Sequence, residues 1–122
     1  MEGIFAVNKP VGITSHDVVD LLRKKAGVRR VGHGGTLDPL ASGVLVIAVG
    51  RENTKQLDEF VKGEKEYIAT IFLGANSTTD DEEGEKQNVN VNIKPDIEKI
   101  KEMSKLFIGN IMQTPPIYSS VK

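Results

Sequence analysis

The sequence predicts an α+β fold with a mixed, largely antiparallel sheet and flanking helices. The strongest indication is the unbroken apolar run from Val44 to Val49, which is typical of a strand buried on both faces. A second indication is the segment from His16 to Lys25, where apolar residues form one face of a helix. Because helices of varied length separate the predicted strands, we expect α+β with a mixed sheet.

The chain begins with a predicted strand followed by a helix. The segment from Ile4 to Val7 is apolar, and Pro10 ends it because proline cannot donate a hydrogen bond to a sheet. Ser15 is a favourable N-cap for the helix from His16 to Lys25, and Gly27 ends that helix.

A second short helix is predicted after the apolar strand. Gly50 ends the strand, and either Asn53 or Thr54 can cap a helix that runs to about Phe60 or Val61. Leu57 is expected to face the core.

The second half of the chain gives weaker signals. Glu64 to Leu73 alternates apolar and polar residues, which predicts a second clear strand. Residues 76–92 are polar and acidic and indicate a loop or weak hairpin. Pro95 is expected at the first position of a helix that extends up to Gly109, and Ile111-Met112 could form a short strand.

Length and composition bound the class of protein. At 122 residues, with 39% hydrophobic and 27% charged residues, the chain is expected to be at most one soluble globular domain. The absence of cysteine excludes disulfides and thiolate metal sites. No apolar stretch is long enough to span a bilayer and no signal pattern begins the chain, so we expect a cytoplasmic location.

The charge pattern limits nucleic-acid binding to a local patch. A formal net charge of −1 argues against a uniformly basic face. Five basic residues nevertheless gather between Arg23 and Arg30, and of these Arg29 and Arg30 are candidates for contact with an RNA backbone. The alternative is a solvated helix end that the helix dipole favours.

Asp38 is the principal candidate for chemistry. It lies in the glycine-rich stretch from Arg30 to Gly43 with Pro39 directly after it, so its backbone can bend tightly and approach a ligand. An ionised carboxylate held in this way could act as a nucleophile or a general base. The alternative is that Asp38 only shapes the turn through its own hydrogen bonds.

Other site classes fit the sequence less well. The glycines follow a helix and precede a strand, which is the wrong context for a dinucleotide fingerprint, and no P-loop sequence exists. His16 and His33 are the only histidines, and the acidic stretch from Asp80 to Glu85 lacks the ligand alternation of a calcium loop. Tyr67 could be a half-buried strand aromatic or a platform for an extruded base.

Five blocks, taken in order and spacing, resemble the TruB family of tRNA pseudouridine synthases. The blocks are Asn8 to Ser15, Arg30 to Gly43, Lys65 to Tyr67, Leu73-Gly74 with Thr79-Asp80 and Gly84, and Pro115 to Lys122. The resemblance covers essentially the whole chain, and it is closer to the bacterial enzymes than to the guide-RNA-dependent relatives. It implies a pseudouridine synthase-like catalytic domain.

The resemblance implies that uridine-55 in the T loop of tRNA is isomerised to pseudouridine, with no metal or organic cofactor. Asp38 matches the family's catalytic aspartate, which attacks the flipped nucleotide at uracil C6 or at ribose C1′. Tyr67 matches the tyrosine that stacks on the target base, and His33 matches the histidine that fills the vacated space. Lys9 and Pro10 match a motif that supports the active-site loop, and we group them with the substrate-binding residues. The implied partner is tRNA, with neither a membrane nor a protein partner.

The chain departs from the family pattern at two places. Gly34 stands where the family usually has threonine or serine, which we expect to loosen the turn. The arginine that pairs with the catalytic aspartate, a second active-site tyrosine and an RNA-binding PUA domain have no match before Lys122. We therefore expect residues 1–122 to be the N-terminal portion of the catalytic domain and to be inactive alone.

Two alternative functions come from other classes. The first is a non-catalytic module that binds or folds RNA, although the balanced charge argues against strong autonomous binding. The second is an unrelated acid–base hydrolase that uses Asp38, although no second carboxylate is well placed in the sequence.

Overall fold

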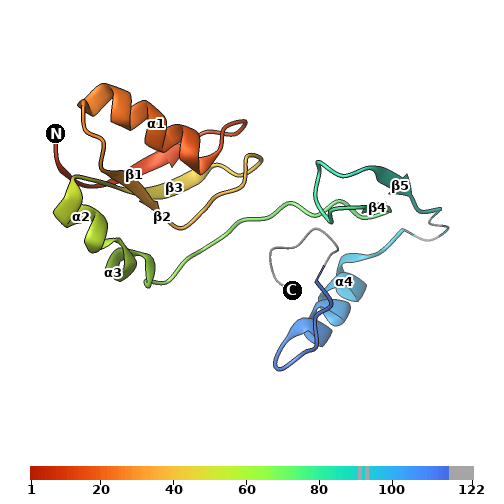
Figure 1. Ribbon diagram of the computed structural model, residues 1–122. Coiled ribbons are helices and arrows are strands. Elements are labelled where there is room, and N and C mark those ends of the chain that lie inside the picture. Colours follow the sequence, from red (N-terminus) through yellow and green to blue (C-terminus); the bar gives the residue numbers. More distant parts are fainter. Residues whose placement is uncertain (91, 93, 116–122) are drawn as a thin grey trace. The chain divides into compact units, whose positions relative to one another are not determined.

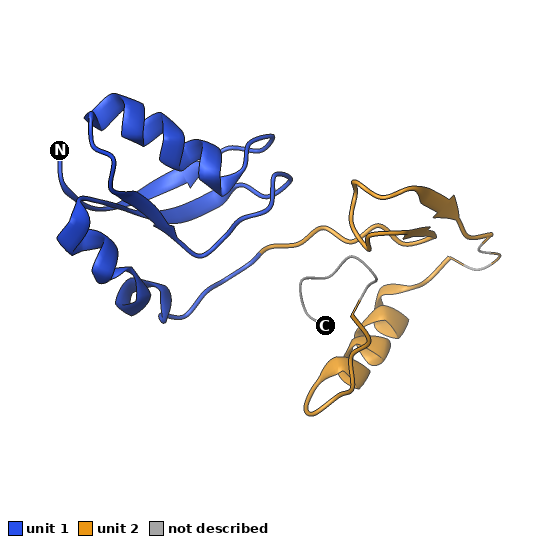
Figure 2. Cartoon of the chain, viewed as in Figure 1, with its two compact units in different colours: residues 1–67 blue, residues 68–122 orange. Residues whose placement is uncertain are grey.

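The computed structural model describes residues 1–90, 92 and 94–115. The chain forms two compact units, residues 1–67 and residues 68–122 (Figure 2). Both units combine helices with antiparallel strand pairs, which confirms the predicted α+β class. Of the last sequence block, Pro115 to Lys122, residues 116–122 lie outside the described residues.

The first unit is built on a three-stranded sheet. Its strands are β1 (Gly3–Lys9), β2 (Val31–Gly34) and β3 (Gly43–Val49), in the order β1-β3-β2 with both pairings antiparallel (Figure 1). Gly3 pairs with Val49 and Lys9 with Gly43, while Val31 pairs with Val49 on the other side. The predicted strand 44–49 is therefore the central strand of the sheet.

Burial along β3 follows from its central position. Ile47, Ala48 and Val49 are fully buried, which confirms burial on both faces over this part of the strand. Val44, at the start of the strand, is 72% exposed, so the prediction fails there. The whole apolar run therefore lies in the strand, but it is not buried along all of its length.

Helix α1 (Ser15–Ala26) supplies the other side of the core. Val18 and Val19 pack in one cluster with Val31, Leu45 and the end of β3. Gly27 ends the helix in the left-handed conformation, with φ of 65°, as the sequence predicts.

The start of α1 corrects the predicted cap. The N-cap is Thr14, whose hydroxyl accepts a hydrogen bond from the Asp17 amide at 3.0 Å, while the Asp17 carboxylate accepts from the Thr14 amide at 2.7 Å. The Thr14 hydroxyl also donates to the Asp17 carboxylate at 2.7 Å. This bond is the main cause that holds the pKa of Asp17 below its usual range, and the bond from the Thr14 amide adds to it. Ser15 is the first helical residue and is turned into the protein.

The helix after β3 also begins earlier than predicted. Gly50 is the N-cap, and the helical segment is divided into two short helices, α2 (Arg51–Lys55) and α3 (Leu57–Val61). Asn53 does not cap a helix, because its side-chain amide donates a hydrogen bond to the carbonyl of Val49 at 2.8 Å. Leu57 is buried, as predicted.

The predicted strand from Glu64 to Leu73 is wrong. Within the described residues this segment forms no strand, and Ile68 is 94% exposed. Alternating side chains supply two faces, but a strand also needs a neighbour for its backbone hydrogen bonds. None of the strands in the described part of the chain pairs with this segment.

The second unit contains less regular secondary structure than the first. A hairpin joins β4 (Ala75–Ser77) and β5 (Lys86–Asn88), which confirms the weak hairpin expected between residues 76 and 92. Helix α4 (Ile97–Ser104) continues into the 3-10 helix η1 (Lys105–Phe107).

Two predictions in this unit are wrong. Pro95 is not the first helical residue, because Asp96 is the N-cap and accepts from the Lys99 amide at 2.8 Å. Ile111-Met112 forms no strand in the structure. Over the described residues, no helix is both long and apolar enough to cross a membrane.

Candidate active site

Asp38 lies on the connection between an edge strand and the central strand of the first unit. Residues 35–42 link β2 to β3, and Asp38 is exposed on this link. The amide of Ala41 donates to the carbonyl of Asp38 at 3.0 Å, so residues 38–41 form a tight turn. The carboxylate is accessible to a ligand.

A buried serine holds the residue before Asp38. The Ser15 hydroxyl accepts a hydrogen bond from the Leu37 amide at 2.9 Å and lies 3.1 Å from the Leu37 carbonyl, to which it donates. Both backbone groups of Leu37 are thereby bonded to the first residue of α1.

A second connection holds the residue after Asp38. The amide of Gly12 donates to the carbonyl of Pro39 at 2.8 Å. Gly12 has a φ of +91°, a conformation that favours glycine. Figure 1 shows the loops that carry Gly12 and Asp38 at the same end of the sheet.

Lys9 supports the loop that carries Gly12. Its side chain is fully buried, and Nζ donates to the carbonyls of Pro10 at 2.9 Å and Ile13 at 2.7 Å. Pro10 itself is exposed. The structure thus gives Lys9 a direct part in holding the backbone of the loop, while its contact with substrate stays a prediction.

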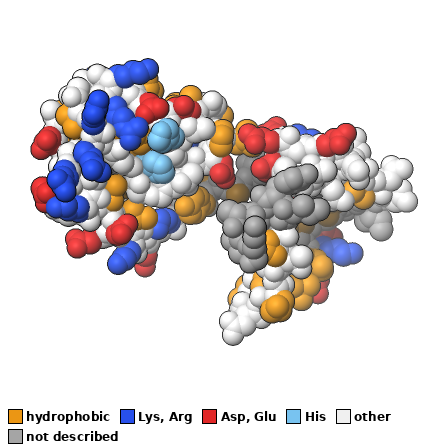
Figure 3. Space-filling view, viewed as in Figure 1, with side chains coloured by type: hydrophobic (Ala, Val, Ile, Leu, Met, Phe, Trp, Pro, Cys, Tyr) orange, Lys and Arg blue, Asp and Glu red, His pale blue; other side chains and the backbone are white. Residues whose placement is uncertain are grey.

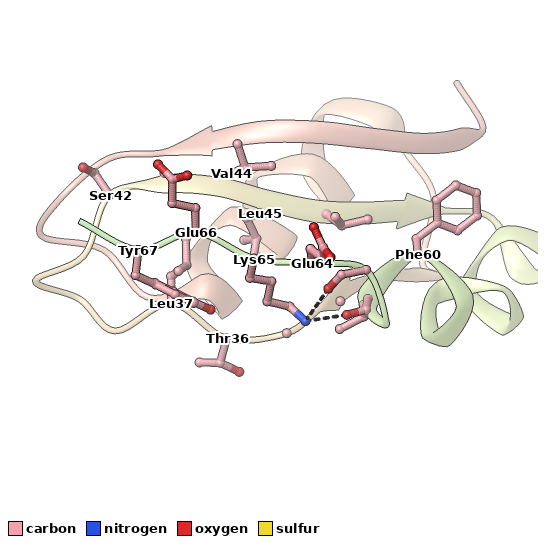
Figure 4. Close-up of a pocket in the computed structure, with 16 residues that line it drawn as sticks. Thr36, Leu37, Ser42, Val44, Leu45, Phe60, Glu64, Lys65, Glu66 and Tyr67 are labelled. Carbon is pink, nitrogen blue, oxygen red and sulfur yellow. Dashed lines mark hydrogen bonds between the residues drawn. The ribbon is translucent and has the colours of Figure 1, made fainter. Parts of the chain in front are cut away.

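A pocket of about 390 Å³ opens beside the Asp38 loop. Thr36, Leu37 and Ser42 line it from the loop, and the segment from Glu64 to Tyr67 lines it from the other side. Figure 4 shows this segment alongside β3. Nζ of Lys65 donates hydrogen bonds to the backbone carbonyls of Val61, the last residue of α3, and of Gly63. Asp38 is the direct neighbour of lining residue Leu37 and does not itself line the pocket.

Tyr67 and His33 lie near this pocket in different ways. The Tyr67 side chain lines the pocket and is 71% exposed, so its ring face is open to a flat partner. This exposure differs from the half-buried strand aromatic that was the alternative. His33 belongs to β2, and its Nδ1 bonds to the Gly35 carbonyl at 2.5 Å. Because a carbonyl only accepts, that nitrogen carries the proton.

Arg29 and Arg30 lie away from Asp38. Both precede β2, whereas Asp38 follows it, so the strand separates them along the sheet. Together with Arg23 they line a shallow pocket of about 500 Å³. Figure 3 shows lysine and arginine side chains gathered on this part of the first unit. The structure does not bring these arginines to the carboxylate.

The described residues offer no metal centre: across 1–90, 92 and 94–115, no three histidine, aspartate or glutamate side chains are placed to share a metal ion.

Comparison with known proteins assigns the chain to a family. Residues 23–122 match the family described as TruB family pseudouridylate synthase (N terminal domain). The chain belongs to the TruB family. It is 48% identical, over all of its length and 46% of the relative's, to a tRNA pseudouridine synthase B of Protochlamydia amoebophila. It is also 48% identical to a protein of the same name from Desulfotalea psychrophila, over 98% of the chain and 49% of the relative.

A solved structure supports the same assignment. The chain matches a crystal structure of a Cbf5-Nop10-Gar1 complex with a TM-score of 0.63 and 29% identity, over 98% of this chain and 31% of the other. The chain spans about half the length of the two tRNA pseudouridine synthase B relatives described above.

Gly34, where the resemblance leads us to expect threonine or serine, is closely packed, so the expected loosening of the turn is wrong. It is the last residue of β2 and pairs with Val46. A Cβ at this position would clash with Cγ2 of Val61 and lie 3.2 Å from Cδ2 of Leu57. Helix α3 thus occupies the space that a side chain at position 34 would need.

We expect Gly34→Thr to lower the stability of the first unit by about 1–3 kcal/mol, because Val61 is β-branched and cannot turn away freely. Urea unfolding measures this loss. The double variant Gly34→Thr with Val61→Ala should recover part of it, since the clashing methyl is removed. A Gly34→Thr protein as stable as the parent would contradict the packing argument.

Sequence reasoning missed part of this TruB site. Ser15, Gly12 and Pro39 were not singled out, yet they supply the bonds on both sides of Asp38. Ser15 does stand in the block that resembles the family, but it was interpreted as a helix cap. No local pattern indicates that it contacts a residue 22 positions away.

Proposed function

We propose that the natural gene product carrying these residues isomerises uridine-55 in the T arm of tRNA to pseudouridine, with Asp38 as the nucleophile. Membership of the TruB family supports the reaction, and the relatives named tRNA pseudouridine synthase B support the substrate. The observation that carries the site is Asp38 itself, an exposed carboxylate on a loop bonded through both neighbouring residues.

The reaction needs an attack, a rotation and a new bond. Asp38 attacks the flipped nucleotide at uracil C6 or ribose C1′, and the bond between N1 of uracil and C1′ of ribose breaks. C5 then bonds to C1′, and the bond to Asp38 is broken again, so the carboxylate is regenerated. The hydrogen on C5 leaves as a proton, and N1 gains one, so the product is an isomer. Extruding the base costs a few kcal/mol, and stacking on an aromatic ring returns about 1–3 kcal/mol. The exposed ring of Tyr67 is suited to that stacking. The family resemblance gives His33 the role of filling the vacated space.

The test follows the hydrogen on C5. A T-arm stem-loop carrying tritium at C5 of the target uridine is incubated with the gene product, and tritium released to water is counted. We expect one tritium released per target uridine, and no release from an RNA labelled at a stem uridine. Binding of the RNA without any release would reject catalysis and favour the non-catalytic module.

Arg29 and Arg30 are proposed to contact the RNA backbone away from the reacting base. Replacing both with glutamine should weaken RNA binding and reduce the slope of log K against log salt by about 1–2, since each phosphate contact contributes about 1. Lys101→Gln, which removes a cation of α4 in the second unit, is the matched control. If the control changes the slope as much as the double variant, the arginines have no special part in binding.

A further inference from the structure

The backbone sets the point from which the Asp38 side chain extends. Within the described part of the chain, no group donates a hydrogen bond to that carboxylate, and the loop bonds fall on Leu37, Pro39 and the Asp38 carbonyl. The position of Cα and Cβ of Asp38, and with it the space that the carboxylate can reach, therefore depends on how firmly its two neighbours are held.

The two connections differ in rigidity. Gly12 belongs to an exposed loop that itself needs support from Lys9. Ser15 is 2% exposed and is the first residue of the twelve-residue helix α1. The bonds from Ser15 therefore hold the Asp38 loop more firmly than the bond from Gly12 does.

The chemistry of this connection is specific to a hydroxyl. One oxygen accepts from the Leu37 amide and donates to the Leu37 carbonyl, which satisfies both backbone groups of that residue at once. An alanine at position 15 would keep the helix but could make neither bond. The residue is too buried to contact an RNA.

We propose that Ser15 is a positioning residue for Asp38, which it orients by holding both backbone groups of Leu37. This inference rests on the proposed function, because it concerns the rate of the step in which Asp38 reacts. Misplacing a reacting group by about 1 Å can cost 10²-fold in rate. Loss of this connection should therefore slow the reaction without weakening RNA binding.

The test compares Ser15→Ala with Thr14→Ala in the natural gene product. The measurements are the single-turnover rate of tritium release at saturating protein, the Kd for the T-arm RNA, the melting temperature, and the exchange rate of the Leu37 amide. For Ser15→Ala we expect a rate about 10- to 100-fold lower, a Kd within about twofold, and faster exchange at Leu37. Thr14→Ala removes the helix cap and leaves the Leu37 bonds, so it should lower the melting temperature and keep the rate within about twofold.

Several results would overturn the inference. One is a Ser15→Ala rate within twofold of the parent with faster Leu37 exchange, because the connection would then be lost without consequence. Another is a slower rate with unchanged exchange, because the loss would not pass through Leu37. An equal loss of rate in Thr14→Ala would assign the effect to the helix in general. Full activity of Asp38→Asn would reject the proposed function instead, whatever Ser15 does.

Discussion

Replacing Asp38 with asparagine is expected to abolish pseudouridine formation, lowering the single-turnover rate by about 10⁴-fold or more. The carboxamide has nearly the same size and shape as the carboxylate, but it is not a nucleophile. Because Asp38 is exposed and its backbone bonds do not involve the side chain, the loop should keep its shape. The tritium-release assay measures the rate, and the Kd for the T-arm RNA should change by less than about threefold.

Asp20→Asn is the matched control for this change. Asp20 lies on α1, where its carboxylate pairs with Arg23 at 2.9 Å on the surface. Exposed pairs of this kind contribute about 0–1 kcal/mol, so the protein should fold and react as the parent does. If the Asp38→Asn protein retained the parental rate, Asp38 would not be the nucleophile.

Replacing Lys9 with methionine is expected to have the second largest effect. Methionine fills a similar volume, but the carbonyls of Pro10 and Ile13 lose their charged donor. Hydrogen bonds to charged groups contribute about 1.5–3 kcal/mol each, and removing a buried ammonium returns part of that through its lower desolvation cost. We therefore expect a net loss of about 2–3 kcal/mol in the free energy of unfolding, measured by urea denaturation.

The same variant should also lose activity, because the loop that gives the Gly12 amide to Pro39 would no longer be held. Lys55→Met is the control: its Nζ pairs with Glu52 on the surface at 2.9 Å, so its loss should cost less than about 1 kcal/mol. Equal destabilisation by the two variants would show that burial of Lys9 has no special consequence.

Local signals were sufficient for much of the fold. The glycine at position 27 and the apolar run before Gly50 each determine structure through neighbouring residues, and both predictions are confirmed in the structure. β2 was missed because its four residues, Val31–Gly34, include two glycines and show no apolar alternation. Its pairing with β3, and not its own propensity, makes it a strand.

The wrong predictions share a physical cause. Glu64 to Leu73 has the alternation of a strand, but pairing depends on a neighbour that the pattern of one segment cannot reveal. Thr14 and Ser15 are both good capping residues, and only the fold decides that Thr14 caps while Ser15 turns inward. For the candidate site, the sequence predicted the nucleophile through a family resemblance, while the bonds that hold it depend on contacts between distant residues.

The strand order has a consequence for how the first unit assembles. β2 and β3 are neighbours in the sequence, joined by the link that carries Asp38, so they can pair early as a local hairpin. β1 pairs with β3 across a much longer stretch of chain, and residues 12–15, which hold the Asp38 loop, follow β1 directly. An intermediate with the hairpin formed and β1 undocked would therefore contain the carboxylate without its orientation. Docking of the first strand would thus bring Gly12 and Ser15 to the loop that carries Asp38.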